Sequence, residues 1–210
     1  MVPKDASSQN FTSAQLQQVC LPEGLIRGPF GGSLTKSEFV SSGYQVYEQR
    51  HAIYGTEVPA RYFVSASKFH SMKRFSVQPG DFIVSCSGTI GKISRVSESS
   101  PPGIINQALL IIRLDKTVVV PEFFLQYFRW DYFQQSITES IQGGAMKNLV
   151  GMDKFKTAEV LLPNFNEQIK IAKLLSDADD LIHSVERLIS KKQAIKQGMM
   201  QELLKSVEGL

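Results

Sequence analysis

The sequence predicts an α+β protein in which a mixed globular domain is followed by one long C-terminal coiled-coil helix. Up to about residue 162, short apolar runs bounded by Gly, Pro and Asn alternate with brief helical segments. After Pro163 there is no further proline and no glycine before Gly198, and apolar residues recur with a seven-residue period. We therefore divide the chain into a globular domain, 1–162, and a helical region, 163–210.

The predicted strands of the globular domain are runs of apolar and β-branched residues between turn signals. They cover Tyr44 to Tyr47, Phe82 to Val84, Lys92 to Val96, Ala108 to Leu114 and Val160 to Leu162. Three helices are expected among them. The first is capped by Ser65 and runs through Met72, the second begins with Pro121 and ends near Arg129, and the third covers Tyr132 to Ile141 and stops at Gly143-Gly144.

The long helix is expected to begin at an N-cap, Asn166, and to reach about Lys205. About forty residues at about 1.5 Å each give a rod of roughly 60 Å, whose apolar stripe needs a partner in water. One alternative is that the helix packs back on its own domain. Pairing with another chain is favoured, because a compact domain of this size is shorter than the rod. The residues predicted to make that contact are Leu174, Leu181, Ile182, Val185, Leu188, Ile189 and Ile195.

Composition excludes several classes of protein. The 210 residues are 42% hydrophobic and 20% charged, as in a globular protein with a core. No apolar run approaches the about 20 residues that span a membrane, and the polar start of the chain does not read as a signal peptide. Two cysteines are too few for a disulfide framework. We expect a cytoplasmic protein, and the net charge of +3, which lies before residue 163, is weak support for nucleic-acid binding.

Catalytic patterns are incomplete. A nucleotide-binding P-loop needs glycine in place of Cys86 and Ser or Thr in place of Ile93. A DNA aminomethyltransferase needs an aromatic residue after Ser-Pro-Pro, where Gly103 stands. The histidines and cysteines are not at metal-ligand spacing, and no histidine is signalled as a partner for Cys86. We expect no catalytic residue, metal or cofactor, and we predict that Cys86 is a structural thiol.

The segment Pro79 to Lys92 is the most informative part of the chain. It reads as a turn, a short apolar strand and then a loop of small hydroxyl residues between Gly88 and Gly91. Glycine allows close backbone approach, hydroxyls donate and accept, and lysine adds a cation. This loop is suited to touching phosphates and base edges.

The predicted DNA-contacting residues are small, polar or basic residues of expected loops and helix faces. They are Gly31, Gly32, Ser33, Gln49, Arg50, His51, Lys68, Lys73, Arg74, Ser87, Thr89, Lys92, Lys147 and Asn148. Arg50 has the donors to pair with guanine and Gln49 with adenine. The alternatives stay open: a turn at 31–33, a solvated loop at 49–51, an exposed helix face at 68–74 and a helix C-cap at 147–148.

Five segments, in order, resemble motifs of the specificity (S) subunits of type I restriction-modification systems. They are Gly28 to Ser33 (GPFGGS), Gly80 to Lys92 (GDFIVSCSGTIGK), Ile105 to Leu109 (INQAL), Gly144 to Leu149 (GAMKNL), and Pro163 with Glu167-Gln168. Two positions depart from the motifs: Asn164 replaces a second proline, and Gly32 replaces a more usual serine.

The resemblance implies a non-catalytic subunit with one target-recognition domain and one long helix, either a half-subunit or a fragment. Such a subunit binds double-stranded DNA and directs modification and restriction subunits to a bipartite target. Its long helix pairs with a second copy or with a second half-subunit, and no membrane is involved. Two other classes stay open, a coiled-coil adaptor without a DNA role and an enzyme with a nonstandard active site.

Overall fold

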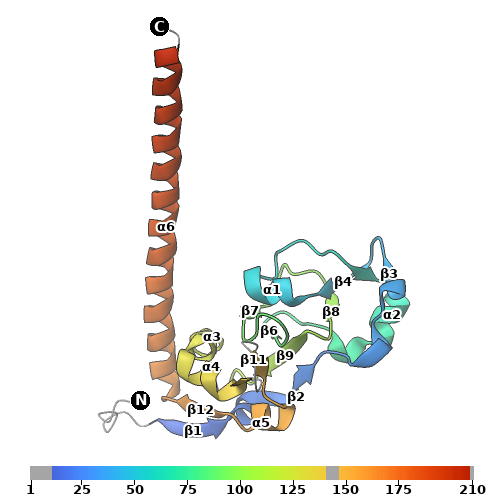
Figure 1. Cartoon of the computed structure of the whole chain (residues 1–210). Helices are drawn as coiled ribbons and strands as arrows, with labels where there is room; N and C mark the ends of the chain where they lie inside the picture. Colours follow the sequence, from blue (N-terminus) through green and yellow to red (C-terminus); the bar gives the residue numbers. More distant parts are fainter. Residues whose placement is uncertain (1–10, 141–146, 209–210) are drawn as a thin grey trace. The chain divides into compact units, whose positions relative to one another are not determined.

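The computed structural model describes residues 11–140 and 147–208, and the chain divides into two compact units between Ile169 and Lys170 (Figure 1). Each unit is described by itself. The first is the mixed domain, and the second is the rest of the C-terminal helix α6 (Phe165–Glu208). The predicted fold class, a mixed domain followed by a long helix, is confirmed.

An antiparallel sheet with strand order β2-β9-β6-β7 forms the centre of the domain. Its strands are β2 (Cys20–Arg27), β6 (Phe82–Ser85), β7 (Ile93–Arg95) and β9 (Leu109–Leu114). Side chains alternate between its faces. One face packs Ile26, Ile83 and Ile111 into a core with Ala52 of α1 (Gln49–Tyr54), and on the other Phe82 packs against Phe124 of α3 (Pro121–Arg129). The central sheet is therefore covered by helices on both faces.

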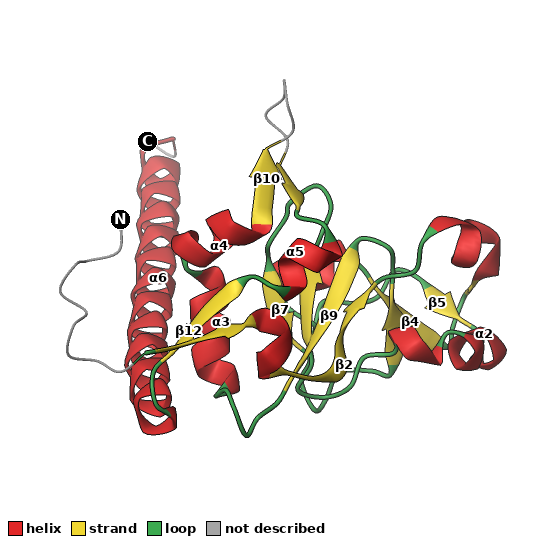
Figure 2. Ribbon diagram, turned by 90° about the horizontal axis from the view of Figure 1, so that it is seen from below, coloured by secondary structure: helices red, strands yellow, loops and turns green. Residues whose placement is uncertain are grey.

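A second sheet has the strand order β3-β5-β4-β8. It contains β3 (Phe39–Val40), β4 (Tyr44–Tyr47), β5 (Phe63–Val64) and β8 (Gly103–Ile105), and the β4–β8 pair is parallel. Helix α2 (Ala66–Ser71) packs Phe69 on Tyr44, with ring centroids 3.9 Å apart. Both views place α2 at the end of the domain remote from α3 (Figures 1 and 2).

Four further strands and two helices complete the domain (Figure 2). β1 (Thr12–Gln15) pairs with β12 (Glu159–Leu162), and β10 (Thr138–Ser140) pairs with β11 (Lys147–Leu149). Helices α4 (Asp131–Ile137) and α5 (Met152–Lys156) lie before and after the β10–β11 pair. Short 3₁₀ turns η1 (Leu16–Val19), η2 (Gly31–Ser33), η3 (Lys36–Glu38) and η4 (Lys73–Phe75) link the strands.

The predicted elements are found with small shifts in their ends, and Ser65 caps α2 by accepting from the Lys68 amide. Cys86 is buried as predicted. The helix predicted to continue to Ile141 is wrong, since α4 ends at Ile137 and Thr138 starts a strand. There the Thr138 hydroxyl donates back to the carbonyl of Gln134, and ladder pairing with Leu149 replaces helical bonding. Gly143 and Gly144 lie outside the described residues.

The start of α6 also differs from the prediction. The Asn164 carboxamide oxygen accepts from the Glu167 amide (3.1 Å), so Asn164, and not Asn166, is the N-cap. The Gln168 side chain is buried, where it accepts from Val120 N–H (2.9 Å) and donates to the Pro163 carbonyl (3.1 Å). The Gln168 side chain therefore fixes the first turn of α6 on the loop before α3.

The second unit is a continuous helix whose apolar residues lie in solvent in this single chain. All seven predicted pairing residues are exposed, from 46% for Val185 to 71% for Leu174. Met199 and Leu203 extend this stripe, and the neighbouring Met200 and Leu204 are also exposed. Taken by itself, the helix therefore carries an exposed apolar face.

Candidate nucleic-acid interface

The loop between β6 and β7 is closed by backbone bonds at its stem. Ser85 N–H donates to the Lys92 carbonyl (2.9 Å), and Gly91 N–H donates to the Ser85 carbonyl (2.9 Å). Gly88 and Gly91 have φ of 62° and 75°, a left-handed conformation that other residues adopt at a cost. The loop projects Ser87, Thr89 and Lys92, whose side chains are exposed. These three predicted DNA-contacting residues thus lie on one tight loop.

Gln49, the first residue of α1, holds this loop from one side. Its amide nitrogen donates to the carbonyls of Ser87 and Thr89, the second at 3.1 Å. A Cβ on Gly88 would lie 3.2 Å from the same nitrogen, so a side chain there would press on the clamp. Both amide hydrogens of Gln49 are engaged, so the bidentate pairing with adenine predicted from the sequence is not available in this conformation.

Gln134 of α4 reaches the same loop. Its Nε2 donates to the Phe128 carbonyl (2.5 Å), and a Cβ on Gly91 would lie only 2.1 Å from its Oε1. The β6–β7 loop is therefore bonded by Gln49 and closely approached at Gly91 by Gln134. Neither glutamine carries a sequence signal for this role, because the contacts join residues 38 or more positions apart.

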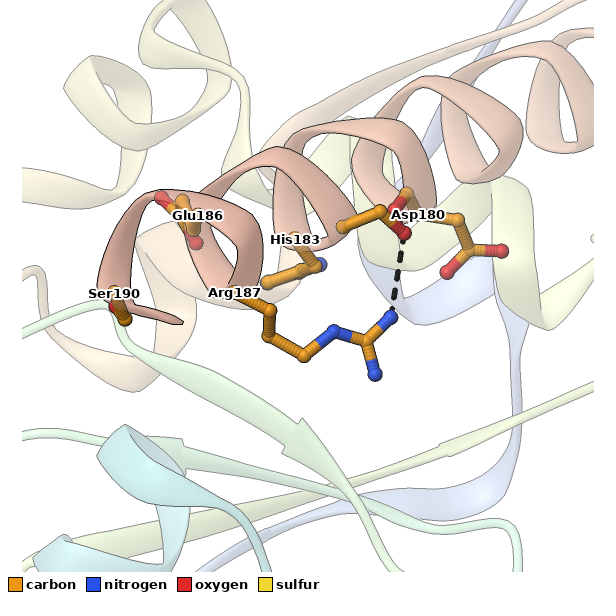
Figure 3. Close-up of a pocket in the computed structure, with 6 residues that line it drawn as sticks. Asp180, His183, Glu186, Arg187 and Ser190 are labelled. Atoms are coloured by element: carbon orange, nitrogen blue, oxygen red, sulfur yellow. Dashed lines mark hydrogen bonds between the residues drawn. The ribbon is translucent and has the colours of Figure 1, made fainter. Parts of the chain in front are cut away.

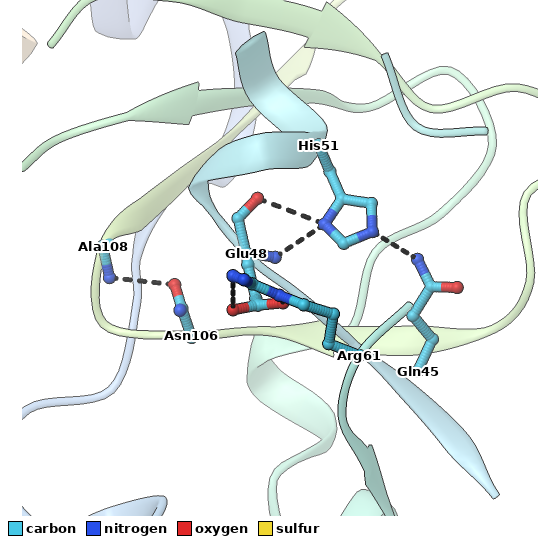
Figure 4. Close-up of polar contacts among 6 residues, drawn as sticks. All are labelled: Gln45, Glu48, His51, Arg61, Asn106 and Ala108. Carbon is cyan, nitrogen blue, oxygen red and sulfur yellow. Dashed lines mark hydrogen bonds and ion pairs between the residues drawn. The ribbon is translucent and has the colours of Figure 1, made fainter. Parts of the chain in front are cut away.

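Polar contacts around the start of α1 fix its orientation (Figure 4). Arg61 makes two hydrogen bonds to the Glu48 carboxylate, of 2.9 and 3.1 Å, and the Glu48 carboxylate is largely buried. His51 is fully buried, with Nδ1 2.9 Å from the Glu48 amide nitrogen and Nε2 3.3 Å from Gln45 Nε2. Burial lowers the pKa of His51, and the neighbouring Glu48 opposes that effect in part.

The prediction that His51 contacts DNA is therefore wrong. The sequence places it in a polar loop beside Arg50, but Glu48 to Tyr54 is a capped helix, and His51 faces inward. A side chain with no accessible surface cannot touch DNA. Arg50 itself is half-buried at the start of the helix, one residue from the loop clamp.

The remaining predicted contacts lie on separate elements. Gly32 and Ser33 are exposed in η2, where the Ser33 hydroxyl bonds the Phe30 carbonyl (2.8 Å), and Gly31 begins that turn. Lys68 on α2 pairs with Glu38, so part of its charge is neutralised within the chain. Exposed Lys73 and Arg74 follow in η4. Lys147 and Asn148 begin β11, and their side chains lie outside the described residues, as does Gly144 to Met146 of the same motif.

Arg27, for which the sequence carries no signal of a role, is the last residue of β2. Its Nη1 is buried without a hydrogen-bond partner in the described part of the chain. Its guanidinium lies beside the Cys86 thiol and opposes the burial that raises the pKa of that thiol to about 12. Cys86 is thus neutral at physiological pH and unsuited to nucleophilic chemistry.

Two recesses in the described part of the chain are alternatives to the β6–β7 loop as a binding site. One, on α6, is lined by Asp180, His183, Ser184, Glu186, Arg187 and Ser190, and within it Arg187 donates to the Ser184 hydroxyl (3.2 Å; Figure 3). All six residues come from one helix, which cannot enclose a ligand. The other, about 480 Å³, lies along the bulge of β2, and its charged lining residues are Glu23, Arg74 and Lys156.

The described residues contain no group of three or more His, Cys, Asp and Glu side chains placed to hold a metal. Nor does any helix among them combine the length and apolarity needed to cross a membrane. The chain combines a mixed domain, whose β6–β7 loop exposes polar and basic side chains, with a long helix that exposes an apolar face. This combination is typical of a binding protein.

Comparison with known proteins identifies the family. Residues 31–196 match the family described as "Type I restriction modification DNA specificity domain", so the chain belongs to that family. The resemblance seen in the sequence motifs is confirmed. The chain is 28% identical over 146 residues to the "Putative type I restriction enzyme MjaX specificity subunit" of Methanocaldococcus jannaschii. That match covers 67% of this chain and 34% of the relative.

Solved structures share the fold at low sequence identity. A chain from a study of complex assembly and conformational transition of the type I R-M system matches 92% of this chain with a TM-score of 0.69 and 17% identity. The HsdS subunit from Thermoanaerobacter tengcongensis matches 91% with a TM-score of 0.63 and 21% identity. The S subunit from M. genitalium matches 89% with a TM-score of 0.55 and 17% identity. This chain spans 44%, 47% and 44% of those three chains, respectively, less than half of each.

Proposed function

We propose that this protein reads a short DNA sequence as a specificity subunit of a type I restriction-modification system. The β6–β7 loop carries the proposal: it holds exposed Ser87, Thr89 and Lys92 in one clamped turn, beside Arg50 at the start of α1. Hydroxyls, a guanidinium and an ammonium are the groups that contact base edges and phosphates. The rigid stem lowers the entropy lost on binding.

In this proposal the chain has two roles in separate regions. Residues 1–162 form the DNA-reading domain, and residues 163–210 form the spacer and pairing region. The exposed apolar stripe of α6 supports pairing, because a helix of 44 residues with such a face is unstable alone in water. A second copy, or a second half-subunit, would supply a second reading domain and therefore a bipartite target.

The catalytic steps are assigned to partners. The chain presents DNA to modification and restriction subunits, in the cytoplasm, and has no chemistry of its own. Purified free of those partners, it should neither methylate nor cleave DNA and should hydrolyse no ATP. Turnover that survives rigorous removal of partner subunits would contradict this assignment and favour an enzyme with a nonstandard site.

The test of DNA reading is a gel shift on a randomised duplex pool, with the methyltransferase partner supplied, followed by sequencing of the bound fraction. Enrichment of one interrupted motif supports the proposal. Binding without enrichment would remove the reading role and leave nonspecific affinity. No binding at low salt would favour the coiled-coil adaptor, since phosphate contacts are strongest there.

A further inference from the structure

The backbone of the β6–β7 loop is polarised by the Gln49 clamp. Gln49 Nε2 donates to the carbonyl oxygens of Ser87 and Thr89. Each of these carbonyls shares a peptide plane with the next residue's amide, Gly88 N–H and Ile90 N–H. All described peptide bonds are trans, so C=O and N–H of one plane point in opposite directions. Both amides therefore point away from Gln49.

Within the described residues, neither of these two amides donates to an acceptor. Within the described residues the loop's recorded amide bonds belong to Ser85, Cys86, Gly91 and Lys92, and none is made by Gly88 or Ile90. Two backbone amides without a protein acceptor in an exposed turn are available to donate to an anion. Because water can accept from both amides in the free protein, the absence of a protein acceptor costs little free energy.

The groups around the two amides favour a phosphate. The Ser87 and Thr89 hydroxyls are exposed and make no recorded hydrogen bond, and the Lys92 ammonium follows two residues after Ile90. No carboxylate lies within the loop from Ser85 to Lys92. Gly88 has no Cβ, so a bulky tetrahedral anion can approach the backbone closely.

We propose that the backbone amides of Gly88 and Ile90 bind a phosphate group, and that Gln49 is the positioning residue that keeps them turned outward. The proposal rests on the proposed DNA-reading function for the source of the phosphate, a DNA backbone phosphodiester. A free phosphate has the same chemistry, so the experiment separates the two sources. Arg50 and Lys92 then lie beside a fixed phosphate anchor, which sets the register in which they meet the bases.

The test is an amide ¹H–¹⁵N NMR titration of the whole chain with inorganic phosphate and, separately, with a random-sequence duplex. We expect the Gly88 and Ile90 amide protons to move downfield with the duplex, as amides do when they donate to an anion. The same shifts with inorganic phosphate identify a site for free phosphate as well. If phosphate shifts these amides but no duplex binds, this site stands and the proposed function fails. A bound duplex that leaves both amides unshifted overturns the site, as does no shift with either probe.

Gln49→Leu tests the positioning role, since leucine keeps the size of the side chain but has no donor. We expect about tenfold weaker duplex binding, the loss of one hydrogen bond to a charged group, with the salt slope unchanged because a backbone amide neutralises no phosphate. The downfield shifts of Gly88 and Ile90 should disappear while resonances of the central sheet stay in place. The matched control is Gln78→Leu, an exposed glutamine beyond the opposite end of β6. A Gln49→Leu protein with the parental duplex affinity and amide shifts would refute the role.

Discussion

Arg113 on β9 makes two hydrogen bonds to Asp81, the residue just before β6, at 2.8 and 2.7 Å. The Asp81 side chain is 3% exposed and also accepts from the Gln78 amide at 2.8 Å. The Pro-Gly-Asp turn is thereby locked onto the neighbouring strand at one end of β6, while the Gln49 clamp holds the loop at the other end. The Gly-Asp part of the motif is thus structural, and the Ser-Gly-Thr part is available for binding.

Asp81→Ala should destabilise the protein by about 2–3 kcal/mol, because it leaves the Arg113 charge and the turn amide without their acceptor. The value lies at the lower end for a broken buried pair, since the Arg113 side chain keeps 23% of its surface in water. Urea unfolding measures it as a lower midpoint. As a control, Arg95→Gln breaks the exposed Arg95–Glu122 pair and should change stability by less than about 1 kcal/mol. Equal effects of the two variants would contradict the structural role of Asp81.

His51 should make stability depend on pH. Burial lowers its pKa in the folded state, so below the ordinary pKa the unfolded chain binds the proton more readily. His51 is therefore compatible with full stability near pH 7 and costs stability as the pH falls through the unfolded-state value of about 6.5. Arg50 works in the same direction as burial, and Glu48 opposes it.

The measurement is the free energy of unfolding of the parent and of His51→Gln between pH 7.5 and about 5.5, the range around an ordinary histidine pKa. The variant should be less stable at pH 7.5 and should lose less stability on acidification. His183→Gln, on the exposed polar face of α6, serves as the control and should keep the parental pH dependence. Identical slopes for the parent and His51→Gln would show that His51 does not titrate in this way.

The sequence predicted the elements that depend on local signals. Pro121 in a first turn, Ser65 as a cap and the seven-residue period of α6 act through neighbours in the chain, and the structure confirms the helices they indicate. Strand β2 was missed because Pro22 and Gly24 interrupt its pattern, which the structure accommodates as a bulge opposite β9. The sequence does not predict the helix at Gln49, because its capping residue is a glutamate.

The interface was harder to predict because its organisation depends on contacts between distant residues. The composition of the β6–β7 loop indicated binding, and its three polar residues are exposed. The clamp by Gln49 and the approach of Gln134 come from helices on opposite faces of the sheet, and no spacing in the sequence records them. His51 looks like its polar neighbours in the sequence, and only the orientation of α1 buries it.

Arg50→Ala should reduce sequence preference if Arg50 contacts a base, at a cost of about 1–3 kcal/mol for the preferred site and little for other sequences. Competition binding of a selected duplex against a scrambled duplex measures the difference. An Arg50→Ala protein with unchanged preference would place base reading elsewhere.

Lys147→Ala should instead weaken binding to all sequences alike and lower the salt slope by about one unit, as expected for a phosphate contact. The slope is measured from dissociation constants across a series of salt concentrations. Unchanged slopes would remove Lys147 from the interface while leaving the β6–β7 loop untested by this variant.

The long helix should pair with a second copy in antiparallel orientation. Leu181 and Leu188 lie on the exposed apolar stripe of α6, and pairing would bury them. The acidic first half of the helix, with Asp177, Asp179, Asp180 and Glu186, would then face the basic second half of the partner copy, with Lys191, Lys192 and Lys196. Parallel pairing would set like charges together.

Sedimentation equilibrium should therefore find a dimer in the parent and a monomer in the Leu181→Asp, Leu188→Asp double variant. The control places the same two charges on the polar face, as His183→Asp with Ser190→Asp, and should stay dimeric. A parent that is monomeric at high micromolar concentration would exclude the dimer, and a dimer that survives the leucine variant would place the interface on another surface.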